Sequence, residues 1–371
     1  MQTASHNLLV LVRSALWGVP AEGLSPQVDW KKVFILAKQH TLVGLLAGAV
    51  QMLPEDSRPD KTILTNLQTY CMKNIQAHML ITRNLARVME LLRSADIEPV
   101  LFKGHGLALN YPDPLSRQCG DIDLYIGKKN YDKAVKCFIS NFGLGGEHDS
   151  ENVKHYHCSC NGVSVELHRI AEILPGVFRN RRYQKWTVEN LAPSNFRLVD
   201  IEGVMVNLPP YNFDAVYVLN HAWHHFVNGG IGLRQLCDWT LYLHRFHSML
   251  DYDKLKKDLK SFGLLRVWHI FAWIAVNRLG LQASECPLYE EKCGKAADKV
   301  LEIVLHDGNF GFYSERGSSK RPEGYSTGKI HSMLVTTKRY FRITHVYPTH
   351  ILKAWVAYFC LGVYHYFKGL F

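Results

Sequence analysis

Val100-Leu-Phe-Lys-Gly-His-Gly106 and Gly120-Asp-Ile-Asp-Leu-Tyr-Ile126 are the two stretches that decide the fold. The first predicts an apolar strand that ends in a glycine turn, and the second predicts a strand with carboxylates at alternate positions. Side chains at i and i+2 of a strand share a face, roughly 6.5–7 Å apart along the strand. We therefore expect Asp121 and Asp123 to converge on one hard divalent cation, Mg²⁺ or Mn²⁺.

The glycine turn adds a second expectation. Gly104 stands where the backbone must come close to another group, and a helix beginning near His105 would present free N–H groups to an anion.

A third carboxylate follows in Val163-Ser-Val-Glu-Leu-His168, which alternates apolar and polar residues and so predicts a strand with Glu166 on one face. If this strand lies beside the Asp121 strand, the three carboxylates form one metal cluster. Two metal ions held in this way activate an attacking oxygen and stabilise a leaving pyrophosphate.

These motifs resemble the nucleotidyltransferase superfamily related to DNA polymerase beta. More narrowly, residues 80–245 resemble the bacterial uncharacterised nucleotidyltransferase family. His105 follows Gly104 where the superfamily usually has serine or glycine, and the gap from Gly104 to Asp121 is longer than is common. The matching segments are Leu101-Phe-Lys-Gly, Tyr111-Pro-Asp-Pro, Arg117-Gln-Cys-Gly-Asp-Ile-Asp-Leu, Val165-Glu-Leu-His and Gly232-Leu-Arg-Gln-Leu-Cys-Asp238.

The resemblance implies a metal-dependent enzyme that transfers a nucleoside monophosphate from an NTP, ATP foremost, to an unidentified acceptor and releases pyrophosphate. Asp121 and Asp123 would hold both metal ions. Glu166 would hold the catalytic metal and help to deprotonate the acceptor. Gly104 and the amides that follow it, including that of His105, would contact the β- and γ-phosphates.

Basic residues complete the expected nucleotide site. Lys103 and Arg117 flank the carboxylates and would offset phosphate charge, although Arg117 in a loop is alternatively a surface residue. The helices from Tyr211 onward are expected to close the open side of the site, with Arg234 facing the nucleotide. The alternative for Arg234 is an i, i+4 ion pair with Asp238.

Composition favours a globular protein of two or three packed units, since 47% of the 371 residues are hydrophobic and 20% are charged. The expected fold is α/β (α+β), with a small mixed-sheet core at 81–208 between helical regions at 1–80 and 209–371. Nine cysteines without a regular framework and no signal peptide indicate the cytoplasm.

The coarse pattern of elements supports this division. Strands are expected at 98–103, 121–126, near 153–168 and at 201–208. Helices are expected at 78–94, 105–110, 130–141, 215–227, 233–246, 252–262, 265–279 and 296–305, and an exposed loop at 311–328.

The chain end is basic and apolar at once. From Gly311 onward there are nine Lys or Arg against two Glu, within a total charge of +10. Such a tail suits a nucleic acid, an acidic membrane surface or nucleotide phosphates, or it is a solvated face. The apolar run 354–367 is shorter than the ~20 residues of a membrane span, so it either lies in a membrane interface or packs as a terminal helix.

Two histidine-rich sets admit other interpretations. His155 and His157 lie near Cys158 and Cys160, but strand alternation turns the histidines and the cysteines to opposite faces, which argues against structural zinc. His221 and His225 share a helix face without the glutamate of a zinc protease; they are expected to pack or, for His221, to line the nucleotide cleft. Gly229-Gly-Ile-Gly232 lacks a P-loop ending and predicts a helix cap and turn.

Two other functions remain open. An Asp-x-Asp pair also holds a metal against the diphosphate of a nucleotide sugar, but a glycosyltransferase needs an α/β half before that motif, and residues 1–95 read as helical. A non-catalytic binding module on the same fold is the second alternative.

Overall fold

A mixed sheet stands at the centre of the computed structural model, which describes residues 3–143, 154–311, 313, 322 and 324–368. Within these residues the six strands follow the order β3-β4-β2-β1-β6-β5, which confirms the predicted mixed α/β fold. The strands are β1 (Val100–Phe102), β2 (Asp121–Tyr125), β3 (His155–Cys160), β4 (Val163–His168), β5 (Arg197–Ile201) and β6 (Val204–Leu208).

Strand pairing fixes which residues stand side by side. β2 runs antiparallel to β1 and parallel to β4, while β3 returns antiparallel to β4. The register places Asp123 of β2 opposite Glu166 of β4, and Glu166 opposite His157 of β3. The strand that carries Glu166 therefore lies beside the strand of the paired aspartates, which meets the condition under which the carboxylates were expected to form one cluster.

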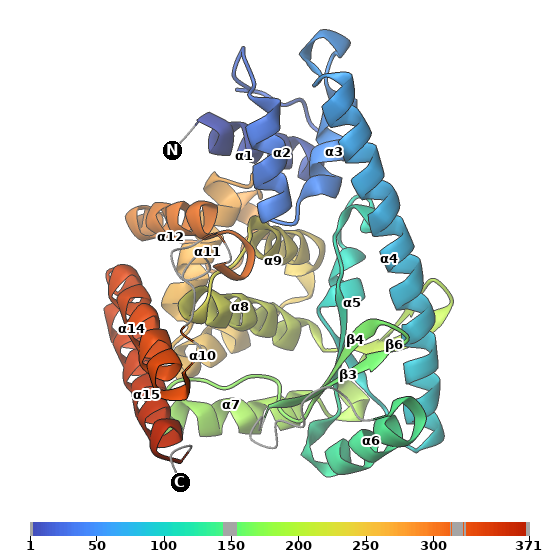
Figure 1. Cartoon of the computed structure of the whole chain (residues 1–371), viewed down its shortest axis with the longest axis vertical. Helices are drawn as coiled ribbons and strands as arrows, with labels where there is room; N and C mark the ends of the chain where they lie inside the picture. Colours follow the sequence, from blue (N-terminus) through green and yellow to red (C-terminus); the bar gives the residue numbers. More distant parts are fainter. Residues whose placement is uncertain (1–2, 144–153, 312, 314–321, 323, 369–371) are drawn as a thin grey trace.

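One face of the sheet is apolar and is covered by α4 (Lys61–Ser94) and α6 (Gly127–Phe142). Asp60 caps α4 by accepting a hydrogen bond from the Ile63 N–H at 2.9 Å, which satisfies one free donor of the first turn. The predicted helix 78–94 is the second half of α4, and its buried stripe includes Leu85 and Val88. Figure 1 shows α4 running from the N-terminal helices along the whole sheet.

The opposite face, which carries the carboxylates, meets the helices that follow Pro209-Pro210. Phe102 of β1 packs on Tyr217 of α8 (Tyr211–Asn228) with ring centroids 4.3 Å apart. Gly229 caps the C-terminus of α8, its N–H donating to the His225 carbonyl at 2.8 Å, and α9 begins after Gly232. The glycine segment is thus a helix cap and turn, as predicted.

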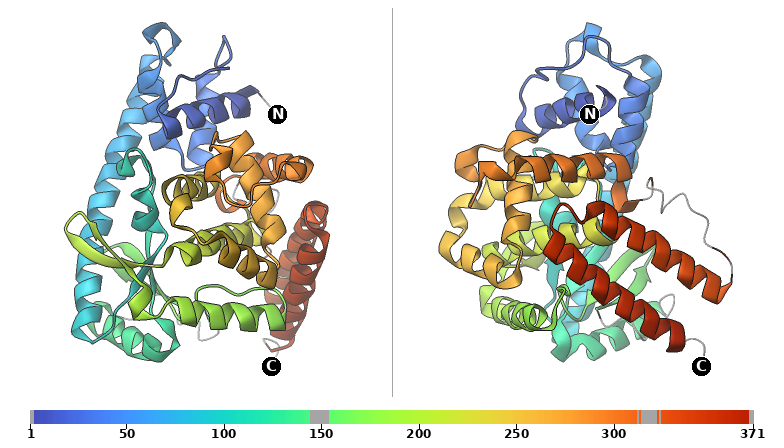
Figure 2. Two further views of the ribbon diagram at one scale, coloured as in Figure 1. Left: turned by 180° about the vertical axis from the view of Figure 1, so that it is seen from behind. Right: turned by 90° about the vertical axis from the view of Figure 1, so that its left-hand side faces the viewer.

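The other helices surround this centre (Figures 1 and 2). Predicted boundaries of 215–227, 233–246, 252–262, 265–279 and 296–305 agree with α8 to α12 within a few residues. The elements are α1 (Thr3–Trp17), α2 (Trp30–Gln39), α3 (Val43–Met52), α5 (Gly104–Ala108), α7 (Val177–Asn190), α9 (Leu233–Phe246), α10 (Tyr252–Phe262), α11 (Leu265–Asn277), α12 (Gly294–Asp307), α14 (Tyr325–Ile343) and α15 (Pro348–Lys368).

The C-terminal hairpin of α14 and α15 corrects one prediction. The loop expected at 311–328 lies mostly outside the described residues, but α14 already begins at Tyr325. α15 packs on α14, where the Trp355 indole N–H donates to the Thr337 hydroxyl at 3.2 Å, and Ile351 is buried. Figure 1 and the left view of Figure 2 place this hairpin on the side of the molecule opposite α4. Among the described helices, none has the length and apolar character needed to cross a bilayer.

Candidate active site

The carboxylates converge on the face of the sheet that meets α8. Asp123 is 2% exposed, and its Oδ1 accepts from the Lys103 ammonium at 3.1 Å and from His168 Nε2 at 2.9 Å. His168 Nε2 also lies 3.2 Å from Glu166 Oε2, so one imidazole joins the two carboxylates. Sequence reasoning missed His168, although its position two residues after Glu166 on a strand places both on one face.

Two groups of side chains have ligand atoms close enough to share a cation. Asp123, Glu166 and His168 form one group, and His155, His157 and Glu166 form the other; within each group the ligand atoms lie within 4.8 Å of one another. Asp121 belongs to neither group. Of the three predicted metal ligands, the structure therefore brings two together and adds histidines to them.

Charge is unevenly balanced in this cluster. The charge of Asp123, together with burial, raises the pKa of Asp121 to about 6. Burial also raises the pKa of Asp123, but Lys103 and His168 outweigh it and hold that pKa below its usual range. The pKa of Glu166 is lowered in the same way, since the hydrogen bond from His168 and the charge of Lys103 exceed the cost of burial.

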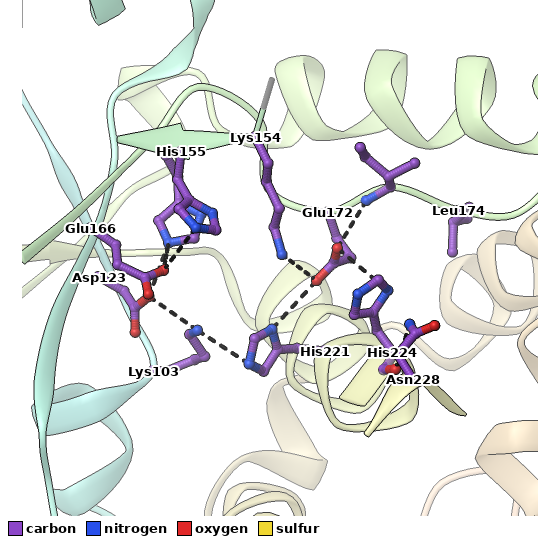
Figure 3. Close-up of polar contacts among 12 residues, drawn as sticks. Lys103, Asp123, Lys154, His155, Glu166, Glu172, Leu174, His221, His224 and Asn228 are labelled. Carbon is purple, nitrogen blue, oxygen red and sulfur yellow. Dashed lines mark hydrogen bonds and ion pairs between the residues drawn. The ribbon is translucent and has the colours of Figure 1, made fainter. Parts of the chain in front are cut away.

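Lys103 leaves the sheet in an uncommon conformation. Its backbone φ is +52° and that of Gly104 is +45°, a region that residues with a Cβ rarely adopt. The turn directs the ammonium of Lys103 between Asp123 and His221 Nε2, 3.2 Å away on α8 (Figure 3). Backbone strain of this kind clusters at functional sites.

A further carboxylate, Glu172, extends this network through the histidines of α8. Sequence reasoning missed it. It is fully buried in the segment after β4 and accepts from Lys154 Nζ at 2.8 Å and from its neighbour Ile173 N–H at 3.1 Å. His221 Nδ1 lies 3.4 Å and His224 Nδ1 3.7 Å from its oxygens (Figure 3). Burial raises the pKa of Glu172, yet Lys154 and the histidines hold it well below the usual range.

Arg117 and Asp238 form a buried pair that corrects one interpretation. Arg117 Nε and Nη2 donate to the two oxygens of Asp238 at 2.8 and 2.9 Å, and the Tyr111 hydroxyl adds a third bond at 2.7 Å. The ion pair expected between Arg234 and Asp238 was therefore wrong: Asp238 takes its cation from a loop 121 residues earlier. Arg117 is also no surface residue, since it is 4% exposed.

Arg234 and His105, the other two residues predicted to bind the nucleotide, lie in different surroundings. Arg234 stands at the start of α9, where its Nη1 donates to the Gln118 carbonyl at 2.6 Å, and its charge reaches Asp121. His105 is 4% exposed and packs against His78 of α4 with ring centroids 4.6 Å apart. Its side chain thus lies in the interior between α4 and α5, whatever its backbone N–H contacts.

Two cavities in the described residues lie away from this cluster. One of about 550 Å³ is lined by α4 and β6 residues such as Met89 and Met205, and one of about 990 Å³ by α2 and α12 residues such as Leu36 and Leu301. Neither contains a carboxylate of the sheet, so the site is located by its chemistry and not by cavity size.

Comparisons with known proteins identify the family of the chain. A family model described as an uncharacterised nucleotidyltransferase matches residues 26–280. A crystal structure of an antigenic nucleotidyltransferase-like protein from Paracoccidioides brasiliensis matches with 14% identity and a TM-score of 0.28, over 50% of this chain and 85% of that one. No curated protein matches the chain. Since the family match spans more than half of the sequence, the chain belongs to the uncharacterised nucleotidyltransferase family.

Proposed function

We propose that the protein transfers a nucleoside monophosphate from an NTP, with ATP the first candidate, to an acceptor and releases pyrophosphate. One observation carries the proposal: Asp123 and Glu166 stand opposite each other on β2 and β4, with Asp121 on the same strand and Lys103 bound between Asp123 and α8. Family membership supports the same class of reaction.

The residues fit a hard divalent cation. Three carboxylates face Lys103 and His168, so among these five described side chains the negative charges exceed the positive ones by one. The pKa of Asp121, raised to about 6 chiefly by Asp123, reflects this excess charge, which a cation would relieve. Asp121, Asp123 and Glu166 would hold Mg²⁺ or Mn²⁺, which would neutralise phosphate charge during transfer.

The side chains around the cluster have separate tasks in this proposal. Lys103 supplies a fixed positive charge for the phosphates, and the turn at Gly104 lets the backbone approach them. Glu166 is ionised at neutral pH and orients the acceptor through a hydrogen bond. Arg234, in the first turn of α9 and partly exposed, would contact a phosphate, whereas Arg117 holds α9 in place through Asp238.

Paired aspartate substitutions test the proposal. Asp121→Asn with Asp123→Asn removes two negative charges and leaves side chains of nearly the same shape. The Kd for Mg²⁺-dependent NTP binding should therefore rise about tenfold or more, which is a loss of about 1.4 kcal/mol of binding free energy for each factor of ten. Calorimetry with each NTP measures the binding, and pyrophosphate release in the presence of a cell extract measures the transfer.

Asp132→Asn on the exposed surface of α6 is the matched control, and it should leave binding unchanged. Metal-dependent NTP binding that survives in the double variant would refute the assignment. NTP binding without pyrophosphate release from any acceptor fraction would favour the alternative, a non-catalytic binding module.

A further inference from the structure

A second cluster of metal-ligand side chains lies outside the carboxylate face. His78 of α4, His105 of α5 and Cys119 of the loop before β2 place their ligand atoms within 4.8 Å of one another. All three side chains are buried, with 2%, 4% and 5% of their surface exposed. No step of the proposed transfer reaction uses these side chains.

A hydrogen bond to a backbone carbonyl fixes the tautomer of His78. His78 Nε2 lies 2.6 Å from the Arg117 carbonyl, which only accepts, so Nε2 carries the proton and Nδ1 keeps its lone pair. A bond from the second ring nitrogen to a backbone carbonyl is the usual support of a metal-bound histidine.

His105 supplies the independent observation. Both of its ring nitrogens are buried beside the Cys119 thiol, and neither makes a well-formed hydrogen bond in the part of the chain that the structure describes. A buried polar atom without a partner costs about 1–3 kcal/mol, so such atoms usually mark a missing ligand or water.

We propose that His78, His105 and Cys119 bind Zn²⁺ or a similar borderline divalent cation. Imidazole and thiolate ligands select zinc, whereas the carboxylates of the sheet suit Mg²⁺ or Mn²⁺, so the two sites differ in the ion they take. On binding, the cation replaces the thiol proton of Cys119, which is released to solvent, and no electron is transferred.

The charges around Cys119 are compatible with a bound cation. Arg117 Nη1 donates to Cys119 Sγ at 3.1 Å, a bond that stabilises a thiolate. The guanidinium itself is already paired with Asp238 through two hydrogen bonds, so its positive charge is offset where the cation would lie.

The position of the site gives it a structural role. It would join α4, α5 and the loop before β2, which are three separate segments along the chain. His105 directly follows Gly104, and Cys119 lies two residues before Asp121. A cation here would fix the glycine turn and the aspartate strand relative to α4, and this holds whether or not the protein transfers nucleotides.

Cobalt substitution tests the site in the full chain. After removal of metal with a chelator, one equivalent of Co²⁺ should give tetrahedral d–d bands together with a thiolate-to-cobalt charge-transfer band, and one equivalent of Zn²⁺ should displace them. Zn²⁺ should also raise the melting temperature. Cys119→Ser should abolish the charge-transfer band and weaken Zn²⁺ binding by at least tenfold, and Cys137→Ser on α6 should change neither.

Absence of a charge-transfer band in the wild-type protein would overturn the proposal without any variant, since that band requires a thiolate ligand. A band that persists in Cys119→Ser would place the metal on another cysteine and overturn it as well. If Cys119→Ser does not fold, His105→Asn replaces it, with the expectation that Zn²⁺ binding weakens at least tenfold. Because the readouts are metal spectra and melting, loss of nucleotide transfer alone has no bearing on them.

Discussion

At the scale of single residues, the chain from Asp123 through Lys103 and His221 to Glu172 defines a proton arrangement. Lys103 donates to His221 Nε2 because an ammonium has no acceptor, so this nitrogen is unprotonated. Burial and the charge of Lys103 hold the pKa of His221 well below its usual range, so the ring is neutral and carries its proton on Nδ1, facing Glu172. In this tautomer, Nε2 of His221 and the carboxylate of Asp123 hold the Lys103 ammonium between them.

His221→Leu tests this arrangement. The substitution replaces the acceptor for Lys103 with an apolar side chain of similar size. The ammonium then loses one charge-assisted hydrogen bond, worth about 1.5–3 kcal/mol. We expect the rate of nucleotide transfer, kcat, to fall about tenfold or more, with a smaller change in KM. His221→Gln, which retains an acceptor, should recover part of the rate.

His224→Leu is the control, because His224 lies 3.7 Å from the same Glu172 and no bond from it to Lys103 is observed in the described residues. Equal losses of rate in His221→Leu and His224→Leu would mean that α8 packing, and not the position of Lys103, controls the reaction.

At the scale of elements, the bond between Arg117 and Asp238 joins α9 to the loop before β2. Both side chains are almost fully buried, and the Tyr111 hydroxyl donates a further hydrogen bond to Asp238. Asp238→Asn leaves the guanidinium without a counter-charge in the interior, which should lower the free energy of unfolding by about 3–5 kcal/mol. Arg234→Gln removes an exposed hydrogen bond and should cost less than about 1 kcal/mol.

Denaturant unfolding of the two variants measures both values, and far-UV circular dichroism checks that each retains its helices. Similar, small losses in both variants would show that the pair with Arg117 is not fully formed in solution. If Arg234→Gln weakens NTP binding while stability stays near wild type, Arg234 contacts the nucleotide as predicted.

Elements with a strong local period were predictable from the sequence. The carboxylate strands alternate with period two, and α9 and α10 begin and end at residues where the apolar stripe does. The polar helix α7 was missed because Val177–Asn190 contains four buried positions among many charged ones, and β5 was missed because an edge strand buries few side chains.

The candidate site was predictable only for residues whose position follows from the alternation of side chains along a strand. Adjacent strands brought Asp123 and Glu166 together, and the same rule reaches His168. The acceptors that hold the two cations come from far along the chain: His221 lies 118 residues after Lys103, and Asp238 lies 121 after Arg117. Local spacing holds no information on such pairs, since they form only when α8 and α9 pack on the sheet.

At the scale of the whole molecule, buried neutral histidines couple the fold to pH. Burial is the main cause that lowers the pKa of His40, His155 and His350 to about 4 and that of His225 to about 3, against 6.5 for an ordinary histidine. Between pH 6.5 and 4 the unfolded chain therefore binds protons that the folded chain excludes. The contribution of these four histidines to stability is fully present above pH 6.5 and falls as the pH drops through this window.

Other groups modify this trend without reversing its sign. Burial raises the pKa of Asp214 to about 6, and Asp123 with burial raises that of Asp121 to about 6, so the folded chain gains protons there as the pH falls from 6 to 4. Two carboxyls oppose four histidines over that range. The carboxyls with lowered pKa, such as Asp238, lose their contribution only at lower pH.

His40 gives the sharpest single test of this coupling. It follows α2, and its Nδ1 accepts from the Leu233 N–H at 3.3 Å, which satisfies a free donor in the first turn of α9. Protonation of Nδ1 would break that bond, so the neutral ring is required. The shift of the His40 pKa from 6.5 to about 4 corresponds to about 3 kcal/mol of stability that is lost on acidification.

In His40→Gln, the free energy of unfolding should fall less steeply between pH 7.5 and 4.5, because unfolding of the variant takes up about one proton fewer than unfolding of the wild type. Denaturant titrations across this range measure the slope, with the exposed His6→Gln as control. Identical slopes in wild type and His40→Gln would show that His40 is protonated in the fold and that its bond to α9 is not made.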